Sequence, residues 1–166
     1  MTPAAGPLGA LEASGIGQAM REWLWLYPAV EIVHIVGIAL LFGSIAVLDF
    51  RLLGFSRTIP VWRLARHVLP WTAGSFVLIL PSGLLMFIAH ASDFITSPVF
   101  VLKMCLILAA GVNAALFHAV VLRTTDVWDS NEMRDLPPPP SARVSAAASL
   151  AIWIAVLACG RLLAYF

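Results

Sequence analysis

The residues of this sequence whose type and surroundings point to chemistry are its four histidines and one nearby glutamate. Glu31 and His34 lie three positions apart in the run PAVEIVHIVGIALLFG, which is otherwise almost wholly apolar. Histidine changes its charge near neutral pH and is a common metal ligand. The other histidines, His67, His90 and His118, also lie in or at the ends of apolar runs. Ionisable side chains in such surroundings are usually functional, so we expect a bound ligand or a proton path.

The composition indicates the surroundings in which these side chains must work. Of the 166 residues, 61% are hydrophobic and 11% are charged, whereas about a quarter of the residues in a soluble domain are charged. A helix needs about 20 apolar residues to cross the hydrocarbon of a bilayer. Four runs meet this requirement, approximately residues 27–52, 68–91, 98–122 and 144–165. Because spanning segments of this kind are helices, we expect an all-α fold, an integral membrane four-helix bundle over residues 23–166.

The distribution of basic residues predicts the orientation of the bundle. The loops after the first and third predicted helices contain seven of the ten Lys and Arg residues, and such loops face the cytoplasm. Both termini are therefore expected outside. Residues 1–22 lack the features of a cleavable signal, and their apolar residues have loosely helical spacing, so we expect a retained periplasmic or interfacial segment that includes a short helix. Asp49, two positions before Arg51, is interpreted as a solvated charge at the cytoplasmic end of the first helix.

The depths of the histidines favour a haem. If the second helix runs outward and the third inward, His67 and His118 each lie within about one turn of the cytoplasmic face and can face each other. Two imidazoles from different helices hold a b-type haem, and a methionine can replace one of them. His67 and His118 are therefore the first candidates for axial ligands. His34 comes next, with His90 or Met86 as its mate.

Other polar residues complete this hypothesis of one or two haem b groups. Glu31 shares a helix face with His34, so it can accept the free ring N–H of His34 or relay protons with it. The propionates of a haem need cations. Arg66 is available on the inner side, and Lys103, inside the third predicted helix, on the outer side.

Two other classes of function stay open. Copper is the first, because His34, His90, Met86 and Met104 lie toward the outer half and imidazole with thioether suits Cu(I). The second is a proton-coupled transport or accessory subunit without a cofactor, in which Glu31 would be important. The run SAAASLA predicts close helix packing, within the chain or in a homo- or hetero-oligomer. With a net charge of +1 and no phosphate loop or nucleophile with its base, neither nucleic-acid binding nor hydrolysis is indicated.

The runs WLYPAVEIVHIVGIALLFGSIAVLDFRLLG, LPWTAGSFVLILPSGLLMF and VFVLKMCLILAAGVNAALFH carry a resemblance. Over residues 25–118 the chain resembles a family of small four-span bacterial inner-membrane proteins known only as a domain of unknown function. More distantly, its layout is similar to four-helix b-type cytochromes and to copper-resistance D membrane proteins. The family implies the four-span topology but no activity. From the histidines, we expect a haem protein of the inner membrane that passes electrons between a quinone or a redox partner and the periplasmic side.

Overall fold

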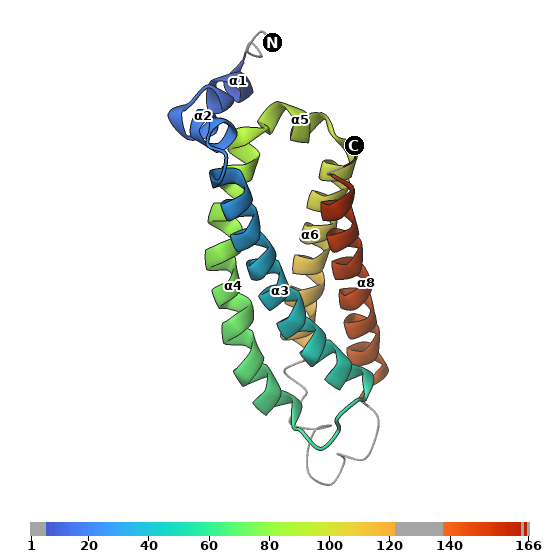
Figure 1. The fold of residues 1–166 in the computed structure, drawn as a ribbon. Coiled ribbons are helices and arrows are strands. Elements are labelled where there is room, and N and C mark those ends of the chain that lie inside the picture. Colours follow the sequence, from blue (N-terminus) through green and yellow to red (C-terminus); the bar gives the residue numbers. More distant parts are fainter. Residues whose placement is uncertain (1–5, 122–137, 164, 166) are drawn as a thin grey trace.

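The four long apolar runs form four long helices (Figure 1). The computed structural model describes residues 6–121, 138–163 and 165, and these residues contain no strand. The helices are α3 (Leu26–Leu53), α4 (Val61–Ala89), α6 (Pro98–Leu116) and α8 (Pro140–Leu162). Each is long and apolar enough to cross a membrane. The predicted all-α, four-helix transmembrane fold is confirmed, and the chain is a multi-pass membrane protein in contact with the lipid bilayer.

Four shorter elements join or cover these helices: α1 (Pro7–Glu12), α2 (Gly15–Glu22), α5 (Ala91–Thr96) and the π-helical η1 (Phe117–Val121). The N-terminal segment thus contains two helices where one was expected. Ser14 separates them, because its hydroxyl oxygen accepts a hydrogen bond from the Gly17 N–H and so caps α2. Helix α5 was not expected, since its residues interrupt the apolar runs.

Helix α4 begins earlier than the apolar run that it contains. It starts at Val61, directly after Pro60, whereas the hydropathy pattern predicted a start at residue 68. Hydropathy reports the part of a helix that matches the hydrocarbon, whereas the helix itself continues through the polar turn that includes Arg63 and Arg66. The interior prolines, Pro70 and Pro81, do not interrupt it.

The long helices pack in the order α4–α3–α8–α6, and α4 makes no comparable contact with α6 among the described residues. Both chain ends lie at one end of the bundle, where α1 and α2 cover α4 and α5 (Figure 1). At the opposite end, an apolar cluster joins the helices. Its buried members are Leu48, Leu52, Val61, Ala65, Phe117, Ala142 and Ala146. The bundle is therefore closed most firmly at the end away from the termini.

Gly37 allows α3 and α4 to cross closely. A Cβ at this position would lie 2.8 Å from Ile79 Cγ1 and 3.1 Å from Leu78 Cβ, both on α4. Small residues at such crossings are the usual means by which transmembrane helices approach each other. The crossing brings the middle of α3 against the half of α4 that lies nearer the chain termini, which we call the outer half, and His34 of α3 contacts α4 there.

Candidate functional site

His34 is half-buried on α3 and contacts α4. Its Nδ1 atom lies 2.9 Å from Ser82 Oγ. The edge of the ring faces Gly83, where a Cβ would lie 3.1 Å from His34 Cε1. Ser82 is 3% exposed, so this polar contact is made inside the bundle. The absence of a side chain at Gly83 leaves room for the ring.

The contacts of Ser82 determine which nitrogen of His34 carries the proton. The Ser82 hydroxyl donates to the carbonyl of Leu78, one turn earlier in α4. Because a serine hydroxyl has one hydrogen, its oxygen then accepts from the Nδ1–H of His34. The backbone of Ile79 is a further hydrogen-bond partner of the ring. His34 is thus oriented through Nδ1, which leaves Nε2 as the ring atom that a ligand could reach.

Two charged side chains act electrostatically on His34, Lys103 from α6 and Glu31 from α3 itself. Lys103 is half-buried, and its Nζ atom lies 3.6 Å from the position that a Cβ on Gly160 of α8 would take. Lys103 has no hydrogen-bond or ion-pair partner among the described residues. Glu31 is exposed. The sequence suggested that its carboxylate accepts the ring N–H of His34, but the partner of His34 Nδ1 is Ser82. The outer half of the bundle therefore brings together the His34 ring and the Lys103 amine, which forms no ion pair with the described residues.

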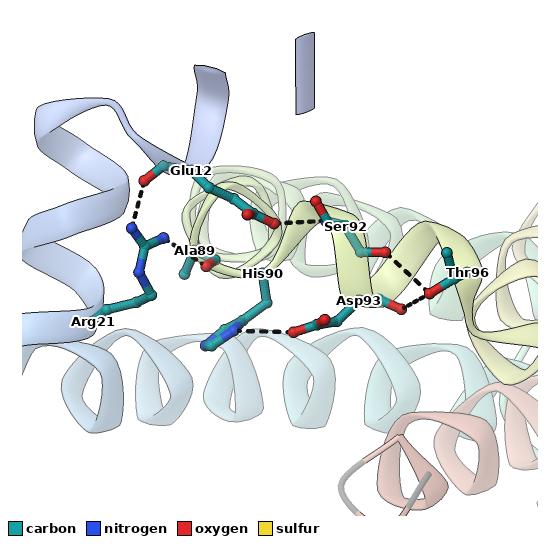
Figure 2. Close-up of polar contacts among 7 residues, drawn as sticks. All are labelled: Glu12, Arg21, Ala89, His90, Ser92, Asp93 and Thr96. Atoms are coloured by element: carbon teal, nitrogen blue, oxygen red, sulfur yellow. Dashed lines mark hydrogen bonds and ion pairs between the residues drawn. The ribbon is translucent and has the colours of Figure 1, made fainter. Parts of the chain in front are cut away.

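His90 lies at the C-terminal end of α4, within a group of polar contacts that we call the outer polar cluster (Figure 2). Its Nδ1 atom is 3.6 Å from Asp93 Oδ2, and its ring meets Tyr27 edge-on at 5.8 Å between centroids. Met86 is half-buried one turn earlier on α4. It follows Ser82 by four positions, so it lies on the same helix face. Of the two expected mates for His34, Met86 is nearer in depth.

The outer polar cluster fastens the N-terminal helices to the bundle (Figure 2). Glu12 Oε1 accepts the backbone N–H of Ser92 at 2.7 Å. Arg21 donates to the carbonyl oxygens of Ala89, at 2.9 Å, and of Glu12, at 2.6 Å. The hydrogen bond from Ser92 lowers the pKa of the Glu12 carboxyl group below its ordinary value, because it stabilises the ionised form.

The residues predicted for the inner side are dispersed. His67 on α4 is exposed, as is Arg66. His118 in η1 is also exposed, with Nδ1 2.8 Å from the carbonyl oxygen of Ala114. No contact links His67 to His118 among the described residues, so this axial pair stays a prediction.

Asp49 is placed differently from the sequence interpretation. It was expected to be a solvated charge, but it is 6% exposed, so that interpretation is wrong. The side chain is enclosed because Ser149 of α8 packs beside it. Arg51, two positions later, is 3% exposed and donates to the carbonyl oxygen of Ile59 at 2.6 Å.

An apolar groove of about 250 Å³ lies between α3 and α4 on the outer half of the bundle. Ser82 is one of its lining residues, so the groove reaches the partner of His34. The others are Ala29, Val30, Val33, Val77, Leu78, Pro81 and Leu85. No three His, Cys, Asp or Glu side chains within residues 6–121 and 138–163 come together to hold a metal ion.

Sequence reasoning missed Ser82 and the burial of Asp49. A weak signal for Ser82 was present. This serine lies nine positions before the end of its apolar run, at residue 91, which is close to the depth of His34 when the two helices are antiparallel. No signal for Asp49 exists in its own helix, since its burial depends on α8.

A family model matches residues 11–166, and its description is "Family of unknown function (DUF6644)". Because the match covers nearly the whole chain, the protein belongs to this family, as the resemblance indicated. No curated protein and no solved structure matches the chain.

Proposed function

We propose that this protein is a b-type haem protein of the bacterial inner membrane, with both termini on the periplasmic side, and that it passes electrons between a quinone or a redox partner and that side. The observation that carries the proposal is the state of His34. Its Nδ1–H is held by Ser82, which leaves Nε2 as the ring atom that a ligand could reach inside the bundle. Histidines that bind metals usually have their second ring nitrogen fixed in this way.

Lys103 supports the same proposal. A haem brings two propionate groups, which need positive charge when they lie near the apolar part of a membrane. Lys103 approaches from α6, acts electrostatically on His34 and has no counter-ion among the described residues. Helices α4 and α6 meet through the stacked rings of Phe87 and Phe100, whose centroids lie 5.9 Å apart, and they are otherwise packed sparsely.

The second axial ligand in this proposal comes from the outer half of α4. Met86 is the first choice, because it lies on the face of α4 that His34 contacts, and His90 is the second. Replacement of a histidine ligand by methionine raises the reduction potential of a haem. The measured potential therefore distinguishes the two choices. His67 and His118 remain the candidates for a second haem.

The groove beside Ser82 is the part of the site that suits a quinone. It opens on the outside of the α3–α4 pair, it is lined almost entirely by apolar side chains, and its polar member is the residue that holds His34. An isoprenoid quinone can enter such a groove from the bilayer. Electron transfer would then need no further protein element between the quinone and the group on His34.

The test is quantitation of haem in protein purified in mild detergent from cells supplied with a haem precursor. Wild type is compared with His34→Ala, His67→Ala and His118→Ala by the pyridine haemochrome spectrum. We expect a b-type signal in wild type and its loss in His34→Ala. Loss of the b-type signal only in His67→Ala and His118→Ala would assign the haem to those two histidines instead of His34. A colourless wild-type protein would refute the proposal.

A further inference from the structure

The segment that precedes α3 exposes a group of large apolar side chains, which we call the N-terminal apolar patch. The patch consists of Ile16 on α2 and the three residues that join α2 to α3, Trp23, Leu24 and Trp25. Ile16 is 54% exposed, and the other three are between 66% and 79% exposed. Single exposed apolar residues are normal on a protein surface, but a group of this kind marks a contact with a membrane or with another protein.

Helix α2 turns only part of its apolar face toward the bundle. Ile16, Met20 and Trp23 lie on one face of this helix, since they are spaced i, i+4 and i+7. Met20 is 2% exposed because α2 packs against α4, whereas Ile16 and Trp23 on the same face stay exposed. The exposed polar side chains of Gln18 and Glu22 lie on the opposite side of the helix. The apolar face of α2 is therefore wider than the part that the bundle covers.

The N-terminal apolar patch continues into the lipid-facing surface of α3. Trp25 is the N-cap residue of α3, and Ile32 and Val36 follow it at i+7 and i+11, so the three side chains lie on one face. Ile32 is 61% exposed and Val36 is 48% exposed. Since α3 is one of the spanning helices, its exposed apolar face contacts lipid. The patch is therefore an extension of a surface that the bilayer already covers.

The outer polar cluster holds α1 and α2 in this orientation (Figure 2). Glu12, the last residue of α1, accepts the backbone N–H of Ser92 in the first turn of α5, where the N-cap residue His90 makes no side-chain cap. Arg21, near the end of α2, donates to the backbone carbonyl of Ala89 at the end of α4. Both contacts bind backbone groups of the bundle. The apolar patch therefore cannot turn inward unless these hydrogen bonds break.

We propose that α2 and residues 23–25 lie in the headgroup region of the bilayer, at the end of the bundle where the chain termini lie, and that the N-terminal apolar patch inserts between phospholipids. Tryptophan is common at this level because its ring is apolar and its N–H binds polar groups. Residues 1–25 contain one Arg and two Glu, so the insertion depends on apolar contact and not on attraction to anionic lipids. It does not depend on bound haem.

This insertion sets the depth of the His34 site. Trp25 then lies at the boundary between headgroups and hydrocarbon, and His34 follows nine residues later in α3, about 13 Å deeper at 1.5 Å per residue. Half the hydrocarbon thickness is about 15 Å, so His34 lies close to the bilayer midplane on its outer side. His90 meets the ring of Tyr27, two residues after Trp25. The outer polar cluster is therefore at headgroup level, where its charged groups stay hydrated.

The test compares spin labels on single cysteines, after both native cysteines are replaced by alanine and the protein is reconstituted into phosphatidylcholine vesicles. Each label is assayed for collisions with oxygen, which concentrates in hydrocarbon, and with a nickel chelate, which stays in water. Ile16→Cys and Trp25→Cys place the label in the patch. Gln18→Cys is the control for water, on the polar side of the same helix, and Ile32→Cys is the control for lipid. All four side chains are exposed, and the elution profile verifies folding.

We expect the ratio of oxygen to nickel collisions at Ile16→Cys and Trp25→Cys to be several-fold higher than at Gln18→Cys and lower than at Ile32→Cys. The ratios should stay the same when phosphatidylglycerol is added. A ratio in the patch equal to that of Gln18→Cys would place the patch in water. Labels shielded from both reagents would show that a second copy or another protein covers it. Either result, or a high ratio that requires phosphatidylglycerol, would overturn the proposal.

Discussion

The close crossing of α3 and α4 at Gly37 makes a quantitative prediction about stability. An alanine Cβ at this position would lie 2.8 Å from Ile79 Cγ1 and 3.3 Å from the Ile79 backbone nitrogen. The first distance is shorter than carbon atoms tolerate, and the backbone atom limits how far the helices can yield. Gly37→Ala must therefore separate α3 from α4, and overpacking of this kind costs about 1–3 kcal/mol of unfolding free energy.

Gly43 provides a matched control on the same helix. A Cβ there would have no atom within 4 Å. Both substitutions gain the higher helix propensity of alanine, up to about 1 kcal/mol, so this gain cancels when the two variants are compared. The difference between them should be the packing cost alone. At about 2–4 °C per kcal/mol for a chain of this size, Gly37→Ala should unfold about 2–12 °C below Gly43→Ala.

The assay is thermal unfolding of both variants and wild type in one detergent, followed by tryptophan fluorescence. The crossing also holds His34 against Ser82, so Gly37→Ala should lose haem in parallel while Gly43→Ala keeps it. Equal unfolding temperatures for the two variants would show that α3 and α4 do not approach at Gly37. The geometry of the His34 site, which rests on that approach, would then be refuted as well.

Three further predictions concern hydrogen bonds. The hydrogen bond from the Ser92 N–H lowers the pKa of Glu12 in the folded state. The folded protein is therefore stabilised by ionised Glu12 above the unfolded pKa of about 4.3, and this stabilisation is lost as pH falls through the folded pKa. Glu12→Gln should flatten the decline of the unfolding temperature on acidification. Asn113 binds Ser145 through both amide atoms, so Asn113→Leu should cost about 0.6–1.7 kcal/mol of α6–α8 association, measured by thermal unfolding. Ser82→Ala should cost about 1 kcal/mol of stability but release a larger share of bound haem, measured by haemochrome, because the His34 ring is no longer fixed.

The four spanning helices could be predicted because hydrocarbon thickness constrains the length of an apolar run. The start of α4 could not, since residues 61–67 continue the helix through a polar region that hydropathy does not detect. The depth of His34 in the membrane could be predicted from its position in the first apolar run. Its partner Ser82 depends on the angle at which two helices cross, which Gly37 permits but which no single helix specifies.

Asp49 shows most clearly where sequence reasoning failed. A carboxylate two positions from an arginine near a helix end has the pattern of a solvated pair. In the structure, Arg51 turns to the carbonyl oxygens of Ile59 and Arg57 in the following loop. Asp49 faces α8, where Ser149 covers it. The two side chains leave the helix about 200° apart, so one can enter the bundle while the other closes the loop.

The most direct test of haem binding at His34 is the reduced-minus-oxidised visible spectrum of wild type and His34→Ala, purified side by side from cells supplied with a haem precursor. We expect a b-type difference spectrum in wild type that is absent or strongly diminished in His34→Ala, at equal yield of folded protein. A wild-type protein without this spectrum, or a His34→Ala protein with an unchanged one, would contradict it.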